Sequence, residues 1–324
     1  MKRRTCITAA AAAFALPCAV CAQTSRTWRV CSAHTSAAAG TRSFEEAFLD
    51  ALRELGFERG RNLEYSARYA DGDPARLPGV VDEVLALKPD LVFCIEAVAR
   101  VMRSKTTTVP IVLTFSSDPV GTGLAQSLAR PGGNVTGVAT LADGLAAKSI
   151  ELLVEVLPKM KTLAMLLDPG VPSSVKLEQP MVEAARTKRV RAVTYWARDR
   201  ASLEQALLAI ERDRPDALLQ PAGSGILYGE RRFINDSTLR LRLPYAAPAV
   251  SGGDGTLLTY GADLHALHRQ AATHAARILK GANPAELPIE LPTRFELVLN
   301  LKVAQAIGVT FPQTVRLRAE RVIE

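Results

Sequence analysis

The sequence predicts an α/β protein with two similar, doubly wound lobes, each built on a mostly parallel β-sheet. Apolar, strand-like runs alternate along the chain with amphipathic helical patterns, which is typical of parallel sheets covered by helices on both faces. A short segment that enters a strand occurs twice, at residues 87–92 and 213–218. A single larger sheet is the alternative, but the 324 residues exceed the size of about 250–300 at which one hydrophobic core usually stops growing.

The first elements follow this alternation. A strand at residues 30–34 is followed by a helix that we expect to begin with a capping box of Ser43 and Glu46. Apolar side chains recur at helical spacing on one face of this helix: Phe44, Phe48, Leu52 and Leu55. A second strand is predicted at residues 63–69.

The next helix is predicted to start at Asp73 and Pro74, because Pro fits the first turn of a helix. Its apolar residues repeat the helical spacing: Leu77, Val81, Val84 and Leu87. Strands are then predicted at residues 88–96 and 109–117, with a short helix between them.

The second half repeats this order. A helix ends near residue 160, a buried strand follows at 162–170, and residues 202–223 combine a helix, a turn and a strand. The segments 87–92 and 213–218 each place a basic residue, Pro and Asp before an apolar strand. Two pseudo-equivalent lobes account for this internal repeat.

The N-terminus has the pattern of a bacterial secretory signal. Three basic residues precede an uncharged, Ala-rich run, which ends in Val20-Cys21-Ala22 before Gln23. The run is too short for a permanent anchor, so residues 1–22 are predicted to be removed and the mature protein to be periplasmic. A lipoprotein with lipid on Cys21 is an alternative, and the Arg3-Arg4 pair leaves Sec and twin-arginine export both open.

Loss of this leader removes three basic residues and no acid, so the net charge falls from +7 to +4. We therefore expect no nucleic-acid partner. Cys31 and Cys94 are the cysteines that remain in the mature chain. In an oxidising compartment they either form a disulfide or stay as two buried thiols, and no cysteine metal site is predicted.

Polar and flexible residues follow most of the predicted strands. In parallel sheets the carboxyl ends of the strands carry the ligand, because helix amino termini and free loop amides converge there. The candidate ligand-binding residues are His34, Thr35, Ser36, Glu96, Ser116, Ser117, Asp118, Thr122, Asp168, Ser224, Asp254 and Tyr260. Tyr260 is equally typical of a half-buried core residue.

The stretch LTFSSDPVGTG, residues 113–123, concentrates such groups after one strand. Hydroxyls of Ser116 and Ser117 with nearby amides suit a carboxylate, and Asp118 or Glu96 suits an ammonium. Gly121 lets the chain bend near a ligand. The alternative is that Asp118 only caps a helix and the serines only form a turn.

Several long motifs resemble the extracytoplasmic solute-binding proteins of ATP-binding-cassette importers that are related to tryptophan- and tyrosine-binding lipoproteins. The resemblance lies in the stretches SDPVGTGLAQSLARPGGNVTGV, LRELGFERGRNLEYSARYADGDPARLP, GTLLTYGAD and ILKGANPAELPIELPTRFELVLNLKVAQAIGV. The resemblance implies a type I periplasmic-binding-protein fold with three crossings between two lobes. Lobe 1 is then residues 23–137 plus 258–290, and lobe 2 residues 138–257 plus 291–324.

The resemblance implies a receptor without catalytic activity that closes on a small solute, an amino acid or related organic acid. It implies a membrane permease and an ATPase as partners, a monomer and no cofactor. The alternatives are a sensory receptor that signals through a membrane protein, and an exported α/β enzyme.

Other chemistry has little support in the sequence. No Gly-x-Ser-x-Gly elbow or phosphate loop occurs, and no carboxylates form an acid/base pair. His265 and His268 lie three residues apart on a predicted helix, but without a third ligand they are interpreted as a solvated helix face rather than a metal site.

Overall fold

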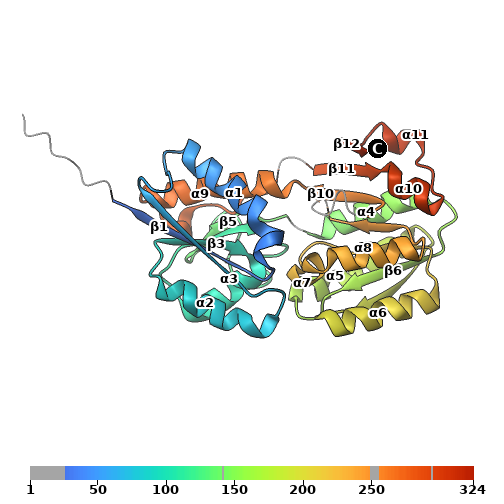
Figure 1. Ribbon diagram of the computed structural model, residues 1–324, viewed down its shortest axis with the longest axis horizontal. Helices are drawn as coiled ribbons and strands as arrows, with labels where there is room; N and C mark the ends of the chain where they lie inside the picture. Colours follow the sequence, from blue (N-terminus) through green and yellow to red (C-terminus); the bar gives the residue numbers. More distant parts are fainter. Residues whose placement is uncertain (1–25, 141, 249–254, 293–294) are drawn as a thin grey trace, which may run out of the picture.

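The computed structural model describes residues 26–140, 142–248, 255–292 and 295–324, so the predicted signal peptide lies outside the described residues. Two sheets with their helices form two lobes side by side (Figure 1). None of the helices among the described residues has the length and apolar character needed to cross a membrane.

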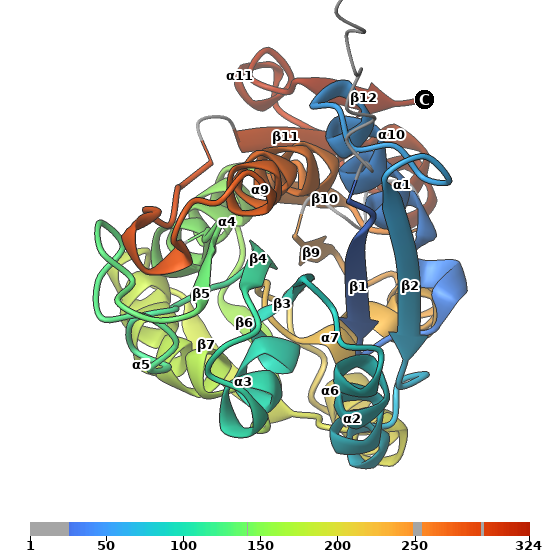
Figure 2. The same ribbon diagram turned by 90° about the vertical axis from the view of Figure 1, so that its left-hand side faces the viewer.

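The first sheet has the strand order β2-β1-β3-β4-β5 and is parallel throughout. Its strands are β1 (Trp28–His34), β2 (Leu63–Tyr69), β3 (Leu91–Ile95), β4 (Ile111–Phe115) and β5 (Val135–Gly137). Its helices are α1 (Ala38–Glu54), η1 (Pro74–Arg76), α2 (Leu77–Ala86), α3 (Glu96–Lys105), α9 (Leu264–Leu279) and η3 (Pro284–Glu286). Figure 2 shows α1 and α9 on one side of this sheet and α2 and α3 on the other.

The second sheet has the order β12-β11-β10-β9-β8-β6-β7, and only β10 with β11 pairs antiparallel among its described strands. These strands are β6 (Thr162–Leu167), β7 (Arg191–Trp196), β8 (Ala217–Leu219), β9 (Tyr245–Ala247), β10 (Leu258–Ala262), β11 (Phe295–Asn300) and β12 (Arg321–Ile323). The helices are α4 (Ala142–Val156), α5 (Pro172–Thr187), α6 (Arg200–Asp213), α7 (Gly225–Gly229), α8 (Arg231–Arg240), α10 (Leu301–Ile307) and α11 (Gln313–Arg316).

The order β7-β6-β8-β9-β10 repeats the order β2-β1-β3-β4-β5, which confirms the prediction of two similar, mostly parallel lobes. In this correspondence β10 is the equivalent of β5, the last strand before the chain leaves a lobe. The lobe boundaries stay a prediction, and the pairing of β10 with β9 and β11 places residues 258–262 with the second sheet rather than the first.

The duplicated segment has the same structural role in both lobes. Lys88 and Arg214 both have a positive φ, of 51° and 47°, so each ends its helix in the left-handed conformation. Asp90 Oδ2 then accepts the amide of Arg29 at 2.8 Å, and Asp216 Oδ2 accepts the amide of Thr162 at 2.8 Å. Each Asp therefore ties the incoming strand to the start of its neighbour.

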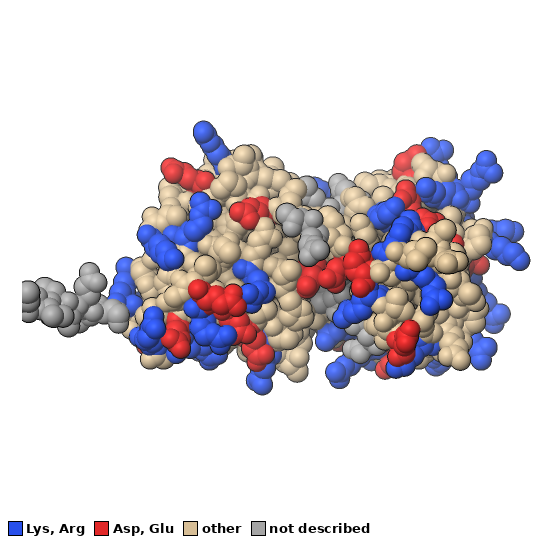
Figure 3. Space-filling model, turned by 90° about the horizontal axis from the view of Figure 1, so that it is seen from above, with Lys and Arg blue, Asp and Glu red and all other residues tan. Residues whose placement is uncertain are grey.

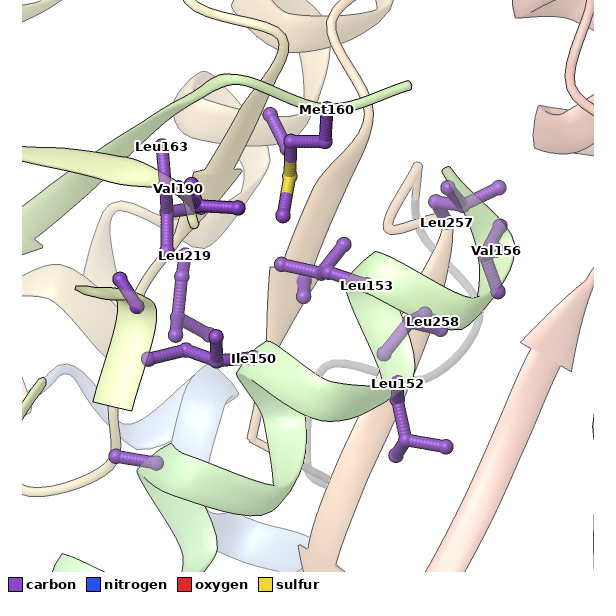
Figure 4. Packing of buried hydrophobic residues seen from close by; sticks show 14 of the residues in the cluster. Ile150, Leu152, Leu153, Val156, Met160, Leu163, Val190, Leu219, Leu257 and Leu258 are labelled. Carbon is purple, nitrogen blue, oxygen red and sulfur yellow. The ribbon is translucent and has the colours of Figure 1, made fainter. Parts of the chain in front are cut away.

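The central strands of each sheet are buried on both faces, because alternate residues point in opposite directions and helices cover both sides. Val30 and Phe93 pack with α1 and α9, whereas Cys31 and Val92 pack with α2 and α3. In the second lobe one core includes α4 and α5, and Figure 4 shows Ile150 of α4 beside Leu219 of β8. The other core is formed with α6 and α8.

The structure corrects the predicted start of the first helix and decides between a disulfide and two free thiols. Helix α1 begins at Ala38, so the expected capping box of Ser43 and Glu46 is wrong, because the alanines before Ser43 extend the helix by more than one turn. Cys31 and Cys94 are free, buried thiols. Cys31 is in register with Val92, so Cys94 lies two residues further along β3, a Cα separation of about 8 Å that is too long for a disulfide.

Candidate ligand-binding cleft

The two lobes meet at the carboxyl ends of their strands, where α7 lies at the boundary between them (Figure 1). Ser36, after β1, donates its hydroxyl to the carbonyl oxygen of Gly225 at 3.3 Å. The Tyr228 hydroxyl donates to the carbonyl oxygen of Gly40 at 3.2 Å. The lobes are therefore in contact along this side of the cleft.

Glu96, the first residue of α3, links the two lobes from a buried position. Its Oε2 accepts hydrogen bonds from Ser116 Oγ at 2.7 Å and from the amides of Ser117 and Asp118 at 2.9 and 3.1 Å. Its Oε1 accepts from Ser173 Oγ of α5 at 3.2 Å. The carboxylate thus organises the loop after β4 and also bonds to the other lobe.

Asp118 lies at the rim of the cleft, where its side chain is 34% exposed. Its Oδ1 accepts the amide of Gly121 at 2.7 Å, and its Oδ2 forms an ion pair with Lys176 Nζ of α5 at 3.1 Å. A Cβ on Gly121 would lie 1.9 Å from Asp118 Oδ2, so only glycine leaves room for this pair. The dense SSDPVGTG stretch therefore contacts the other lobe through Lys176.

A cavity of about 100 Å³ lies between the lobes beside these contacts. This volume is several times what a single water molecule needs. Both lobes contribute to its wall, which consists of His34, Thr35, Ser36, Thr41, Phe44, Ile95, Phe115, Gln220, Ala222, Gly223, Ser224, Gly225, Tyr228, Pro248, Leu264 and His268. The wall is mainly apolar, and among its described residues there is no Lys, Arg, Asp or Glu.

Two histidines are the basic side chains of this described wall. Burial lowers the pKa of His34 to about 4, although Glu45 beside it acts in the opposite direction. Burial likewise lowers the pKa of His268 to about 4. Both rings are therefore neutral near pH 7, so the cavity presents uncharged hydrogen-bonding groups.

Behind His34 lies a buried carboxylate. His34 Nε2 is 3.2 Å from Glu45 Oε1 and 2.9 Å from Ser32 Oγ. Glu45 also accepts hydrogen bonds from Tyr65 at 2.6 Å and from Tyr69 at 3.0 Å. Burial and Glu45 raise the pKa of Tyr69 to about 12, and the same causes raise the pKa of Tyr65 further, so both phenols remain donors.

A larger groove of about 950 Å³ opens between the lobes on the far side of Glu96. Arg100 and Arg103 of α3 and Arg198 after β7 contribute positive charge to it. Asp168 Oδ2 accepts from Ser224 Oγ at 2.6 Å and Oδ1 accepts the Gly170 amide at 2.8 Å. Burial raises the pKa of Asp168 despite these bonds.

The candidate residues are distributed over these spaces. His34, Thr35, Ser36 and Ser224 line the cavity, while Thr35, Glu96, Thr122 and Asp168 line the groove. Tyr260 lines a smaller hollow of about 30 Å³ on the other side of Phe115. Ser116, Ser117 and Asp118 lie in the loop that Glu96 holds, and Asp254 lies outside the described residues. Their roles in binding stay a prediction.

Sequence reasoning missed the aromatic part of the cavity. Phe44 has helical spacing with Phe48 and Leu52 and so resembles a core residue, yet its ring lies 6.3 Å from that of Tyr228 in the other lobe. The interpretation of His265 and His268 as a solvated face is wrong for His268, which is 5% exposed and stacks on Phe44 with ring centroids 5.3 Å apart. Among the described residues no group of three metal-ligating side chains occurs.

Most of the chain is similar to a protein named for tyrosine binding. The chain is 23% identical over 266 residues to a tyrosine-binding protein of Clostridioides difficile (strain R20291), covering 81% of this chain and 76% of that protein.

On the face seen in Figure 3, Lys and Arg side chains are interspersed with Asp and Glu over both lobes.

Solved structures share the two-lobed fold. A conserved domain protein of Vibrio cholerae is 26% identical with a TM-score of 0.85, covering 92% of this chain and 100% of that one. The ABC domain of Streptococcus pneumoniae in complex with L-Trp is 23% identical with a TM-score of 0.84 and the same coverage. The ligand-free, open structure of a Clostridium difficile substrate binding protein has a TM-score of 0.66 at 21% identity, covering 92% and 99%.

The structure thus has two similar lobes, with a cavity where the ends of their strands face each other. The sequence also matches the model of one protein family over most of its length. That match extends from residue 38 to residue 323, and the chain belongs to the ABC transporter substrate binding protein family.

Proposed function

We propose that this chain is the extracytoplasmic receptor of an ATP-binding-cassette importer, which traps a small solute between its lobes and delivers it to a membrane permease. The observation that carries the proposal is the cavity whose wall comes from both lobes. Hydrogen bonds between the lobes, such as Ser173 to Glu96, support a closed form that encloses the solute.

The lining of the cavity supports a solute with an apolar or aromatic side chain. Phe44, Phe115 and Tyr228 offer ring surfaces, and Thr41 and Gln220 offer neutral polar groups. The named ligands of two similar proteins, tyrosine and L-Trp, point in the same direction. An amino acid or a related organic acid is the proposed solute class.

The location and the partners are part of the same proposal. The secretory pattern of residues 1–22 supports a periplasmic receptor, and the family supports a permease and an ATPase as partners. The proposed role needs neither catalysis nor a cofactor, and we propose that the receptor acts as a monomer.

A thermal-shift screen of amino and carboxylic acids on the protein lacking residues 1–22 tests the solute class. A solute at 100 times its dissociation constant should stabilise the fold by about 2.7 kcal/mol, which raises the melting temperature. The proposal fails if none of these solutes raises the melting temperature while a macromolecule does.

A glycine pair tests whether closure matters for binding. A Cβ on Gly225 would lie 2.1 Å from Thr35 Oγ1 and 3.0 Å from Thr35 Cβ, across the lobe boundary, whereas a Cβ on Gly79 meets nothing within 4 Å. Overpacking costs about 1–3 kcal/mol, so Gly225→Ala should weaken solute binding by about 5- to 100-fold. Gly79→Ala should bind as the wild type does. Equal affinity of both variants would mean that the lobes do not close at this contact.

A further inference from the structure

The position of the proton on His34 is fixed by what surrounds its Nε2. Glu45 accepts hydrogen bonds from the hydroxyls of Thr41, Tyr65 and Tyr69, so these three hydroxyl protons point at its oxygens. Since Tyr65 donates its proton to Glu45, Ser32 Oγ donates to Tyr65 and accepts the proton of His34 Nε2 at 2.9 Å. It follows that Nδ1 carries the lone pair.

This Nδ1 has no hydrogen-bond partner among the residues that the structure describes. His34 remains 8% exposed, and it lines the cavity. Its ring is held in place by stacking on Tyr69, with centroids 5.2 Å apart, and by the edge of Phe93 at 6.4 Å. The wall therefore offers a fixed acceptor that only an occupant of the cavity can satisfy.

His268 adds a second acceptor to the same wall. Its Nδ1 lies 2.7 Å from the carbonyl oxygen of Leu264, which can only accept, so Nδ1 carries the proton and Nε2 the lone pair. The carboxylate of Glu45 is the charge behind this region, and no Lys or Arg occurs among the described residues of the wall. The local field therefore favours a cationic donor over an anion.

The other carboxylates near the cleft already have donors. Glu96 accepts four hydrogen bonds, two of them from side-chain hydroxyls. Asp118 is paired with Lys176 and with the amide of Gly121. Asp168 accepts from Ser224 and from the amide of Gly170. The unmet acceptors on the cavity wall are therefore ring nitrogens of His34 and His268 rather than oxygens of these acids.

We propose that His34 Nδ1 binds an ammonium group of the solute, with the Glu45 carboxylate as the charge behind the imidazole, and that this pair selects amines over their deamino analogues. This inference rests on the proposed function and narrows its solute class from organic acids in general to amino acids and other amines. A charge-assisted hydrogen bond of this kind corresponds to about a 10- to 100-fold difference in affinity.

Isothermal titration with matched probes tests the selectivity. The pairs are L-tryptophan with 3-indolepropionate, L-tyrosine with 3-(4-hydroxyphenyl)propionate, and L-leucine with 4-methylpentanoate. We expect each deamino acid to bind at least about tenfold more weakly than its amino acid. If the deamino acids bind as tightly, this inference is wrong while the proposed function stands. If no probe binds, both are overturned.

Two variants assign the selectivity to the His34–Glu45 pair. Glu45→Gln keeps the shape of the side chain and removes its charge, so the amino acid should lose about tenfold in affinity and the deamino acid should change less than about threefold. His34→Phe keeps the stacking on Tyr69, removes both nitrogens and should give the same pattern. Glu183→Gln, on the exposed Glu183–Arg186 pair, is the control and should change neither. Equal losses for both probes in both variants would overturn the assignment.

Discussion

Removal of the Ser173 hydroxyl tests whether hydrogen bonds between the lobes hold the closed form. Ser173 Oγ donates to Glu96 Oε1 at 3.2 Å, and Ser116 Oγ donates to Oε2 of the same carboxylate at 2.7 Å. Ser173 belongs to α5 in the second lobe, whereas Ser116 follows β4 in the same lobe as Glu96. Ser173→Ala therefore breaks a bond that depends on contact between the lobes, and Ser116→Ala is its matched control.

The magnitude follows from the geometry. A hydrogen bond to a charged group contributes about 1.5–3 kcal/mol, and 3.2 Å is long for a bond donated by a hydroxyl. We expect the lower end, about 1.5 kcal/mol, which corresponds to about tenfold weaker binding of the solute. Ala favours a helix more than Ser does, so Ser173→Ala should not lower the melting temperature of the solute-free protein.

Isothermal titration with an amino acid that binds the wild type measures the affinity, and thermal unfolding without solute measures stability. Ser116→Ala should lower the melting temperature and leave the affinity within about threefold, because its bond lies within one lobe. If Ser173→Ala binds as tightly as the wild type, or if Ser116→Ala loses as much affinity, the bond between Ser173 and Glu96 does not hold the closed form.

Three further predictions concern charge, pH and thiols. Lys176→Met should weaken solute binding less than about fivefold, since its ion pair is partly exposed, and titration at about 1 M salt should abolish the difference. Burial lowers the pKa of His268 from 6.5 to about 4, so the unfolded chain takes up a proton at this residue before the folded protein does. The stability present above pH 6.5 is therefore lost as the pH falls toward 4. In melting curves recorded over this pH range, His268→Gln should show a smaller loss of melting temperature than the wild type. Burial raises the pKa of Cys31 to about 11 and raises that of Cys94, so a thiol reagent at about pH 8 should label neither until the protein unfolds, and fast labelling of the native protein would contradict their burial.

The fold could be predicted because its signals are local and repeated. The segments at 87–92 and 213–218 end a helix and start a strand by the same backbone conformation and the same Asp contact. The start of α1 could not be predicted from the capping pattern alone. Ser43 and Glu46 satisfy that pattern, but Ala38 and Ala39 carry the helix further toward the N-terminus.

The site could be predicted only in part. The strand-end rule placed His34, Thr35 and Ser36 at the cavity, because the position of a loop in a parallel sheet follows from topology. The same rule could not show that Glu96 lies outside the cavity wall. Its position depends on four hydrogen bonds, from the loop after β4 and from Ser173 of the other lobe. Phe44 was missed because helical spacing is identical for a residue that faces the core and one that faces the cleft.

The most direct measurement is a crystal structure of the protein without residues 1–22, grown with an amino acid that raises its melting temperature. We expect density for that amino acid in the cavity, in contact with His34 of one lobe and Tyr228 of the other. Density on an outer surface, with the space between His34 and Tyr228 filled by side chains of the protein itself, would contradict it.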